Sequence, residues 1–362
     1  MKAALISLGS VSSKWTLEEM KNFFDEVDDI NIKGIEITLG GKQPTIMYNG
    51  EPLDKYDCVL AKGSFRYNQL LRSITAVLYG HCYMPIRASA FTVGHDKLLT
   101  QLRLQQEGIP MPVTYVSSTP NAAKKMLKCI HYPIIMKFPE GTQGKGIMFA
   151  DSFASANSIL DALAALRQPF IIQEYVETSG VDTRAFVVGD KVVAAMKRKA
   201  IDGEKRANIH AGGVGEATRL DNFTKKIAIE AAGAIGAEIC AIDILQGSKG
   251  PLVIEANLSP GLQGITKATG INVASKIAKY LYEKTKDYSD SMKATGTDKI
   301  MQDVGIQDVQ NIKEIITNIS FRGNRILLPE IVTTIADFNE KEELILRVDR
   351  GKLTLQRLSN DE

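Results

Sequence analysis

The sequence is poor in cysteine and has almost no excess charge, and both features exclude classes of protein. Four cysteines occur in 362 residues, with no C-x-x-C spacing: Cys58, Cys82, Cys129 and Cys240. Without such spacing we expect neither a disulfide framework nor a zinc site, and we interpret all four as reduced thiols in the core. Lysine and arginine number 44 against 42 aspartate and glutamate residues, so the net charge predicts no nucleic-acid partner.

Long hydrophobic runs are also missing. Residues 1–15 hold an apolar run that is too short and too interrupted for a signal peptide. No later stretch approaches the roughly 18 apolar residues that a membrane-spanning helix needs. We therefore expect a cytoplasmic protein with no membrane partner.

The sequence does contain a change of pattern along its length, and the length itself suggests two or three domains. Up to residue 95, short apolar strands alternate with an amphipathic helix expected over Thr16–Glu26, with Thr16 as its N-cap. This alternation is typical of a small doubly wound α/β domain. Asn49-Gly50 predicts a tight turn that joins strands at Thr45–Tyr48 and Glu51–Leu53.

From residue 96 to about 286, long helices occur among short β-rich runs. These runs are too many, and too closely paired by turns, for a parallel sheet throughout. We expect two α+β lobes with antiparallel sheets. Residues 287–320 begin with a polar, small and charged run that is typical of a linker, so a separate C-terminal piece should follow.

Two strands expected at Ala241–Leu245 and Leu252–Ala256 carry a pair of acids. If they form a hairpin, Asp243 lies opposite Glu255, and Asn257 shares their face. Burying two carboxylates is costly unless a cation neutralises them, and an all-oxygen ligand set points to Mg²⁺. Solvent-facing acids at a strand edge are the alternative.

A glycine-rich segment, Glu140–Gly146, lies between strands expected at Ile134–Phe138 and Ile147–Ala150. Backbone without Cβ atoms can approach phosphate oxygens closely, and Lys145 adds charge, so the segment is a candidate phosphate-covering flap. A simple hairpin turn is the alternative. The sequence is neither a Walker A motif nor a G-x-G-x-x-G motif that opens a helix, which excludes P-loop and Rossmann sites. Lys137 ends an apolar strand and would be poorly solvated unless it faced an anion.

Further polar groups follow. The apolar run Phe170–Val176 contains Glu174 and Tyr175 at its end, and an exposed strand end of this kind can contact an adenine edge. Basic residues then cluster at Lys197–Lys199 and Lys205-Arg206, which suits anionic substrates and developing phosphate charge. A solvated basic loop is the alternative.

The order of these motifs resembles the RimK branch of the ATP-grasp superfamily over residues 1 to about 285. The motifs that carry the resemblance are His95–Leu98, the Lys137 strand, Glu140–Gly144, Gln173–Tyr175, Asp182–Arg184, Val187–Asp190, Lys205–Asn208, Asp243–Leu245 and Gly250–Gly261. The resemblance implies an α+β / α/β fold. Its parts would be a preATP-grasp α/β domain over residues 1–95, a central lobe over 96–175, a C-terminal lobe over 176–286, a linker over 287–320 and a small β-rich domain over 321–358.

The resemblance also implies the site. ATP would bind at Lys97, Lys137, Gly144, Lys145, Gln173, Glu174, Tyr175, Asp182, Arg184, Lys197 and Arg206. Magnesium or manganese, as two ions, would bind at Asp243, Glu255 and Asn257. Arg206, Asn208 and Lys137 would be catalytic.

The reaction implied is phosphorylation of a substrate carboxylate to an acyl-phosphate and attack by an amine, which needs no protein nucleophile. L-Glutamate is the expected amine, although another amino acid stays open. The carboxylate acceptor is open between a protein C-terminal tail and a (poly)glutamylated coenzyme. Family members often carry R-S-N-L-H-R-G-G where this chain has Ala207 and Ala211, so this loop does not identify the acceptor.

The C-terminal segment, from Gly323 to Arg357, resembles half of an AbrB-like (SpoVT-type) swapped-hairpin barrel. Such units are built from two chains, which implies a homodimer or homotetramer, and relatives of the barrel bind DNA. Residues 296–362 hold 9 Lys+Arg against 12 Asp+Glu, a net charge of −3, which has the wrong sign for a phosphate footprint. We expect oligomerisation or acceptor docking here. An ATP-sensing, DNA-binding regulator is the alternative function.

Overall fold

The computed structural model describes residues 1–41, 43–139, 146–199 and 214–294, and four C-terminal strands. The chain divides into two compact units, Met1–Gln307 and Asp308–Glu362. The expected site residues Gly144, Lys145, Arg206 and Asn208 lie outside the described residues.

The N-terminal part is a small parallel sheet in the order β2-β1-β6. Strand β1 (Lys2–Ser7) lies in the middle, between β2 (Glu26–Asn31) and β6 (Cys58–Ala61), and pairs in parallel with both. Strands β1 and β6 are almost wholly buried, as expected for apolar runs covered on both faces. Parallel strands are the pairing expected for an α/β part of the fold.

The first helix differs from the prediction. Helix α1 spans Val11–Met20, and the Ser10 side chain caps it by accepting a hydrogen bond from the Ser13 N–H at 3.2 Å. Thr16 is fully buried inside the helix and donates its hydroxyl to the Ser12 carbonyl at 2.9 Å. The expected N-cap at Thr16 is therefore wrong, because an earlier serine takes that role.

An antiparallel edge is formed by β3 (Ile35–Thr38), β4 (Thr45–Tyr48) and β5 (Glu51–Pro52). Asn49 and Gly50 connect the last two strands with φ angles of 53° and 86°. Two positive φ angles are what a tight hairpin turn of this type requires, so the predicted turn is confirmed.

Two short 3-10 helices and three α-helices occur within and after this part. They are η1 (Ile32–Gly34), η2 (Phe65–Tyr67), α2 (Asn68–Leu78), α3 (Ala88–His95) and α4 (Lys97–Gln106). Asp96 caps α4 by accepting from the backbone N–H groups of Leu98 and Leu99, at 2.8 and 2.9 Å. The cap fixes the start of α4 and thereby places Lys97 in its first turn.

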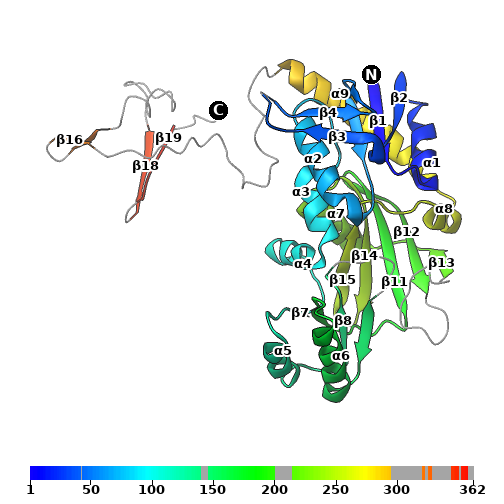
Figure 1. Cartoon of the computed structure of the whole chain (residues 1–362), viewed down its shortest axis with the longest axis vertical. Helices are drawn as coiled ribbons and strands as arrows, with labels where there is room; N and C mark the ends of the chain where they lie inside the picture. Colours follow the sequence, from blue (N-terminus) through cyan, green and yellow to red (C-terminus); the bar gives the residue numbers. More distant parts are fainter. Residues whose placement is uncertain are drawn as a thin grey trace. The chain divides into compact units, whose positions relative to one another are not determined.

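A four-stranded antiparallel sheet follows in the order β7-β10-β8-β9. Its strands are β7 (Thr114–Tyr115), β8 (Ile134–Lys137), β9 (Ile147–Ala150) and β10 (Ile171–Glu174). Helices α5 (Pro120–Leu127) and α6 (Phe153–Ala165) lie beside it in Figure 1. Residues such as Leu127, Met136 and Leu160 form a separate small core in this lobe.

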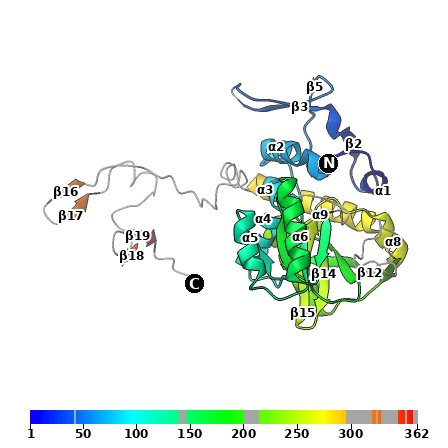
Figure 2. The same ribbon diagram turned by 60° about the horizontal axis from the view of Figure 1, so that its bottom comes forward.

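The largest sheet has five antiparallel strands in the order β13-β12-β11-β14-β15. They are β11 (Val181–Val188), β12 (Lys191–Lys199), β13 (Val214–Ala217), β14 (Ile239–Gly247) and β15 (Gly250–Asn257). Helices α7 (Asn222–Ile235), α8 (Gln263–Thr269) and α9 (Val273–Ala294) complete this part. Figure 2 shows α9 running past the large sheet toward the N-terminal part. One hydrophobic core is continuous across both.

Two boundaries differ from those expected. Leu104 on α4 and Ile109 after it are buried in the larger core, so the independent core of the central lobe begins later than residue 96. Helix α9 continues to Ala294, into the range 287–320 expected as a linker. Its buried face includes Leu281 and Thr285, and Tyr288 of the expected linker is partly buried against the core.

The four cysteines differ in their exposure. Cys58, Cys82 and Cys240 are buried thiols, but Cys129 is exposed, so its assignment to the core is wrong. None of the helices within the described residues is both long enough and apolar enough to cross a membrane.

The C-terminal unit contains two antiparallel pairs. Strand β16 (Ser320–Arg322) pairs with β17 (Arg325–Leu327), and β18 (Leu344–Asp349) pairs with β19 (Lys352–Arg357). The second pair covers residues that were expected to be extended. Residues 323–324, 328–343 and 350–351 lie outside the described residues, and the expected AbrB-like resemblance of this segment is not supported.

Candidate active site

A cavity of about 730 Å³ lies where the three parts of the larger unit meet, which is a size typical of small-molecule sites. Among the residues predicted for the site, those that line it are Lys97, Lys137, Gln173, Glu174, Tyr175, Asp182, Arg184, Asp243, Glu255 and Asn257. Residues separated by up to 160 positions thus converge on one cavity, which the family resemblance implied and the spacing of the residues alone did not.

The acidic pair lies as the hairpin pattern predicts. Asp243 on β14 is paired with Glu255 on β15, and a register shift follows between Asp243 and Ile244. Asp243 is 3% exposed, whereas Glu255 is partly buried and lines the cavity. The Asn257 amide lies 3.5 Å from the Asp243 carboxylate and completes the group, which we name the acidic corner (Asp243, Glu255 and Asn257).

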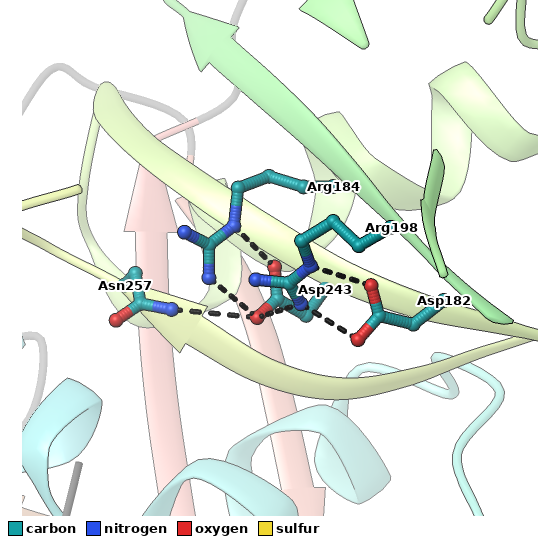
Figure 3. Close-up of polar contacts among 5 residues, drawn as sticks. All are labelled: Asp182, Arg184, Arg198, Asp243 and Asn257. Atoms are coloured by element: carbon teal, nitrogen blue, oxygen red, sulfur yellow. Dashed lines mark hydrogen bonds and ion pairs between the residues drawn. The ribbon is translucent and has the colours of Figure 1, made fainter. Parts of the chain in front are cut away.

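Two arginines lie against this corner (Figure 3). The Arg184 guanidinium donates two hydrogen bonds of 2.7 Å to the two oxygens of Asp243. Arg198 donates two hydrogen bonds to Asp182, at 2.6 and 2.8 Å, and its Nη2 also lies 2.9 Å from Asp243 Oδ2. The register explains this: Arg184 pairs with Asp243 across β11 and β14, and Asp182 pairs with Arg198 across β11 and β12.

Burial and charge act in opposite directions on these acids. Burial alone would raise the pKa of Asp243, but Arg184 and Arg198 outweigh it and lower this pKa to about 2. Burial raises the pKa of Asp182 to about 6 despite its hydrogen bonds with Arg198. Burial, followed by the nearby charge of Asp243, also raises the pKa of Glu255. A cation bound beside Glu255 would therefore stabilise its charged form.

Lys97 and Lys137 lie near enough to Glu255 for their charges to act on it. Lys137 ends β8, is 7% exposed, and donates from Nζ to the Gln173 side-chain oxygen at 2.9 Å. Gln173 is itself held by a 2.8 Å hydrogen bond to the Thr114 hydroxyl. Burial lowers the pKa of Lys137 to about 8, while Glu255 raises it and Lys97 lowers it further. A buried ammonium that lies near a second cation is suited to hold an anion.

The end of β10 forms an apolar wall. The Glu174 carboxylate accepts from the Val113 N–H at 3.0 Å, and the Glu174 N–H donates to the Val113 carbonyl at 2.9 Å. The Tyr175 ring meets Phe149 edge to face, with centroids 5.1 Å apart. Phe149, Val176 and Ile254 line the same cavity, and such a wall suits a flat aromatic base.

Lys197 lies elsewhere. It lines a second, smaller cavity together with Arg219 and Asp221, so the structure places it outside the main cavity. Its neighbour Arg198 lines the main cavity instead, and the sequence analysis did not select it. Because side chains alternate along a strand, only one of two consecutive basic residues can face the site. The pairing of β12 with β11, which places Arg198 opposite Asp182, distinguishes the two basic residues.

The N-terminal part also contributes cavity residues that were not predicted from the sequence. Lys62, Gly63, Ser64 and Phe65 line the cavity directly after β6. The Gly63 N–H donates to the Ser259 hydroxyl at 2.8 Å, which ties this loop to the segment after the acidic corner. The sequence signal was a lysine that directly follows four buried apolar residues.

The described residues fit a nucleotide with a divalent metal. His95 Nε2 is buried beside the cavity and has no hydrogen-bond partner among the described residues, and Lys97 and Lys137 add cationic donors. Gly146 ends the expected flap with a φ of 80°, and a Cβ there would overlap the Phe138 ring.

Within the described residues no group of three or more His, Cys, Asp or Glu side chains could hold a metal. The acidic corner has two carboxylates and an amide instead. Such a sparse oxygen set fits Mg²⁺, which keeps several water or phosphate ligands.

Comparison with known proteins identifies the family. Residues 94–281 match the model of the RimK-like ATP-grasp domain. A probable alpha-L-glutamate ligase of Shewanella loihica is 37% identical over 277 residues, which cover 75% of this chain and 91% of that protein. A probable alpha-L-glutamate ligase of Cellvibrio japonicus is 37% identical over 291 residues, which cover 79% of this chain and 97% of that protein.

Solved structures share the fold. The ATP-grasp ligase PsnB, complexed with its minimal precursor, superposes with a TM-score of 0.62 at 17% identity and covers 78% of this chain and 98% of that one. A RimK domain ATP-grasp protein from Sphaerobacter thermophilus gives a TM-score of 0.59 at 18% identity, with coverage of 78% and 99%.

The fold and the site define an ATP-dependent ligase. The chain belongs to the RimK-like ATP-grasp family. This confirms the predicted fold class and the predicted type of enzyme.

Proposed function

We propose that the protein joins L-glutamate, through its amino group, to a carboxylate of a second substrate, with conversion of ATP to ADP and phosphate. The observation that carries the proposal is the convergence of the acidic corner with Lys97 and Lys137 in one cavity. The relatives named as probable alpha-L-glutamate ligases, of which this chain covers at least 91%, support glutamate as the amino acid.

The residues would act as follows. Asp243, Glu255 and Asn257 hold one or two magnesium ions, and Lys97 and Lys137 hold ATP phosphates together with Gly144 and Lys145 of the flap. Glu174 and Tyr175 frame the adenine, and Gln173 fixes the Lys137 ammonium. Magnesium supplies charge neutralisation at the transferred phosphate.

The two arginines would complete the phosphate side of the site. Arg184 and Arg198 face the cavity with fixed guanidinium groups, so they can stabilise negative charge that develops during phosphoryl transfer. Asp182, expected at the nucleoside, has both carboxylate oxygens bonded to Arg198 and orients that arginine instead. Arg206 and Asn208 keep their expected catalytic role as part of the proposal.

No acid–base triad is required for this chemistry. The substrate carboxylate attacks the terminal phosphate, and the amine of glutamate then displaces phosphate from the acyl carbon, which forms the amide bond. The protein contributes position and charge.

The acceptor is proposed as a class: a peptide or protein C-terminal carboxylate, or a coenzyme that bears glutamate residues. We further propose that the C-terminal hairpins assemble two chains. Deletion of residues 296–362 should then halve the mass measured by light scattering, and an unchanged mass would exclude this role.

The reaction itself is tested by an ADP-release screen. Each common amino acid is combined with candidate carboxylate acceptors, and the product is identified by mass spectrometry. The proposal expects ADP release that depends on glutamate together with an acceptor, and a product heavier by one or more glutamyl residues. ADP release without any glutamyl product, or preference for another amino acid, would contradict it.

A further inference from the structure

The N-terminal part contributes a group of polar residues to the cavity that the proposed reaction does not yet use. Lys62 and Ser64 follow β6, and Ser10 and Ser13 lie at the start of α1 after β1. Strands β1 and β6 are parallel neighbours, so these residues gather at the carboxyl ends of the sheet. Ligands of open α/β sheets bind at that edge.

Lys62 has an unusual environment for a lysine. It is partly buried, and the described residues provide no ion pair to its ammonium group. Burial is the only cause that acts on its pKa and lowers it to about 8, so no carboxylate of the described residues lies near enough to raise it. Lys2, in the same sheet, is different, because Glu26, Asp28 and Asp54 lie within 3.4 Å of its Nζ.

A half-buried ammonium without a counter-ion is costly unless a ligand supplies the anion. At neutral pH a lysine with a pKa of about 8 is still mostly protonated. The hydroxyl groups of Ser10 and Ser13, which also line the cavity, share a 3.0 Å hydrogen bond that uses the proton of one, and the other can donate to an anion. The surroundings therefore suit a carboxylate.

The position of Lys62 separates it from the nucleotide. Across β8 and β10, Glu174 pairs with Ile134 and Lys137 pairs with Ile171, so the adenine wall and the phosphate lysine lie at opposite ends of that strand pair. Glu255 is the acid whose charge acts on Lys137.

The loop that contains Lys62 is bonded to the segment that follows the acidic corner. Ser259 lies two residues beyond Asn257, and its hydroxyl accepts the Gly63 N–H. Lys62 precedes Gly63, so it lies beside the segment that follows the acidic corner along the chain, whereas Ile254 of the adenine wall precedes that corner on β15. The part of the cavity beside Lys62 is therefore available to the amine substrate that attacks the acyl-phosphate.

We propose that Lys62 holds the side-chain carboxylate of the incoming L-glutamate and so makes the enzyme selective for an acidic amino acid. The inference rests on the proposed function, because it assigns a subsite of the same reaction. Lys62 takes no part in bond making. It positions glutamate and excludes neutral analogues, since glutamine would leave the ammonium without an anion.

The test compares Lys62→Met with wild type and with two controls, Lys62→Arg and Lys14→Met. Lys14 is an exposed lysine on α1, so its change removes a charge near the same edge without entering the cavity. Loss of a charge-assisted hydrogen bond of about 1.5 to 3 kcal/mol corresponds to roughly a 10- to 150-fold weaker interaction.

The first readout is steady-state ADP release. We expect Lys62→Met to raise KM for glutamate by about 10- to 100-fold, with KM for ATP changed less than about 2-fold. The preference for glutamate over glutamine should disappear in this variant. Lys62→Arg should recover part of it, and Lys14→Met should behave as wild type. A preserved preference, or equal losses for glutamate and glutamine, would overturn the assignment.

The second readout is direct binding of glutamate, measured by calorimetry with a non-hydrolysable ATP analogue and magnesium present. Binding by wild type that is lost in Lys62→Met supports the subsite even if no glutamyl product forms, in which case the proposed function alone fails. Equal binding by both proteins, or none by wild type, overturns the subsite, while ADP release with a glutamyl product would still uphold the function.

Discussion

Asp243 and Glu255 lie directly opposite each other on β14 and β15, yet their charges are balanced differently. Asp243 is bonded to Arg184 and Arg198, which lower its pKa despite burial. Burial and the charge of Asp243 raise the pKa of Glu255 instead. The pair therefore has one neutralised acid and one whose charge is poorly balanced, which is the electrostatic condition for binding a cation.

Arg198 should be the most important structural member of this network. Its guanidinium bonds to both Asp182 and Asp243, and all three side chains are at most 11% exposed. We expect Arg198→Met to lower the free energy of unfolding by roughly 3 to 5 kcal/mol, because buried Asp182 loses its partner and Asp243 keeps only Arg184. Urea unfolding measures this value.

The matched control for Arg198 is Lys226→Met. Lys226 and Glu230 form an exposed pair on α7, whose loss should cost less than about 1 kcal/mol. Adding Asp182→Asn to Arg198→Met should recover part of the loss, since one unpaired acid is removed. Equal effects of Arg198→Met and Lys226→Met would show that the network does not stabilise the fold.

Lys137 should reduce stability in a pH-dependent way. Its pKa falls from the ordinary 10.5 to about 8 in the folded protein. Between pH 8 and pH 10.5 the unfolded chain holds this proton and the folded chain does not. The free energy of unfolding therefore decreases as pH falls from 10.5 to about 8. Lys137→Met removes this loss. Its free energy of unfolding relative to wild type should thus be highest below pH 8 and decline toward pH 10.5.

Chemical unfolding at several pH values measures that difference, with Lys199→Met on the exposed side of β12 as the control. A pH-independent difference for Lys137→Met would contradict the position of Lys137 in a buried, cationic site. The same variant should lose most ADP release, because the phosphates lose a fixed ammonium.

Gly146 should be required at the base of the flap. Its φ of 80° and the Phe138 ring both oppose a side chain. Gly108 has a φ of 66° with open space around it, so it isolates the backbone effect. We expect Gly146→Ala to raise KM for ATP at least about 5-fold, and Gly108→Ala to leave it nearly unchanged at a cost of about 1 kcal/mol in stability. Similar KM values for both variants would show that the flap base does not contact the nucleotide.

Glutamate binding should weaken in alkaline solution. The Lys62 ammonium loses its proton as pH rises through about 8, since burial lowers its pKa. The apparent KM for glutamate should therefore rise from pH 7 to pH 9, after the usual correction for ionisation of the glutamate amine. In Lys62→Arg the same rise should vanish, because a guanidinium stays charged over this range. An identical profile for both proteins would contradict the role of Lys62.

Local sequence signals predicted the parts of this site that depend on neighbours in the chain. Asn49-Gly50 carries its own turn chemistry, and the pairing of Asp243 with Glu255 follows from a short hairpin. The family resemblance then related Lys97 and Lys137 to the same cavity.

The features that were missed depend on contacts between distant segments. Lys62 lies in a loop that is held at the site by a distant segment. The N–H of its neighbour Gly63 donates to the Ser259 hydroxyl, 196 positions further along the chain. Lys197 and Arg198 are both basic, and only the pairing of β12 with β11 shows which one faces inward. Thr16 was one of several hydroxyl residues that could cap a helix, and packing buried it instead.

The central claim is that the acidic corner holds the magnesium needed for ATP turnover, and Glu255→Ala tests it most directly. The measurement is the initial rate of ADP release against magnesium concentration, with circular dichroism to verify the fold and Glu216→Ala, an exposed acid on β13, as the control. We predict a rate at least about 100-fold lower for Glu255→Ala at any magnesium concentration, with an unchanged spectrum and a control equal to wild type. Wild-type turnover by Glu255→Ala would contradict the account.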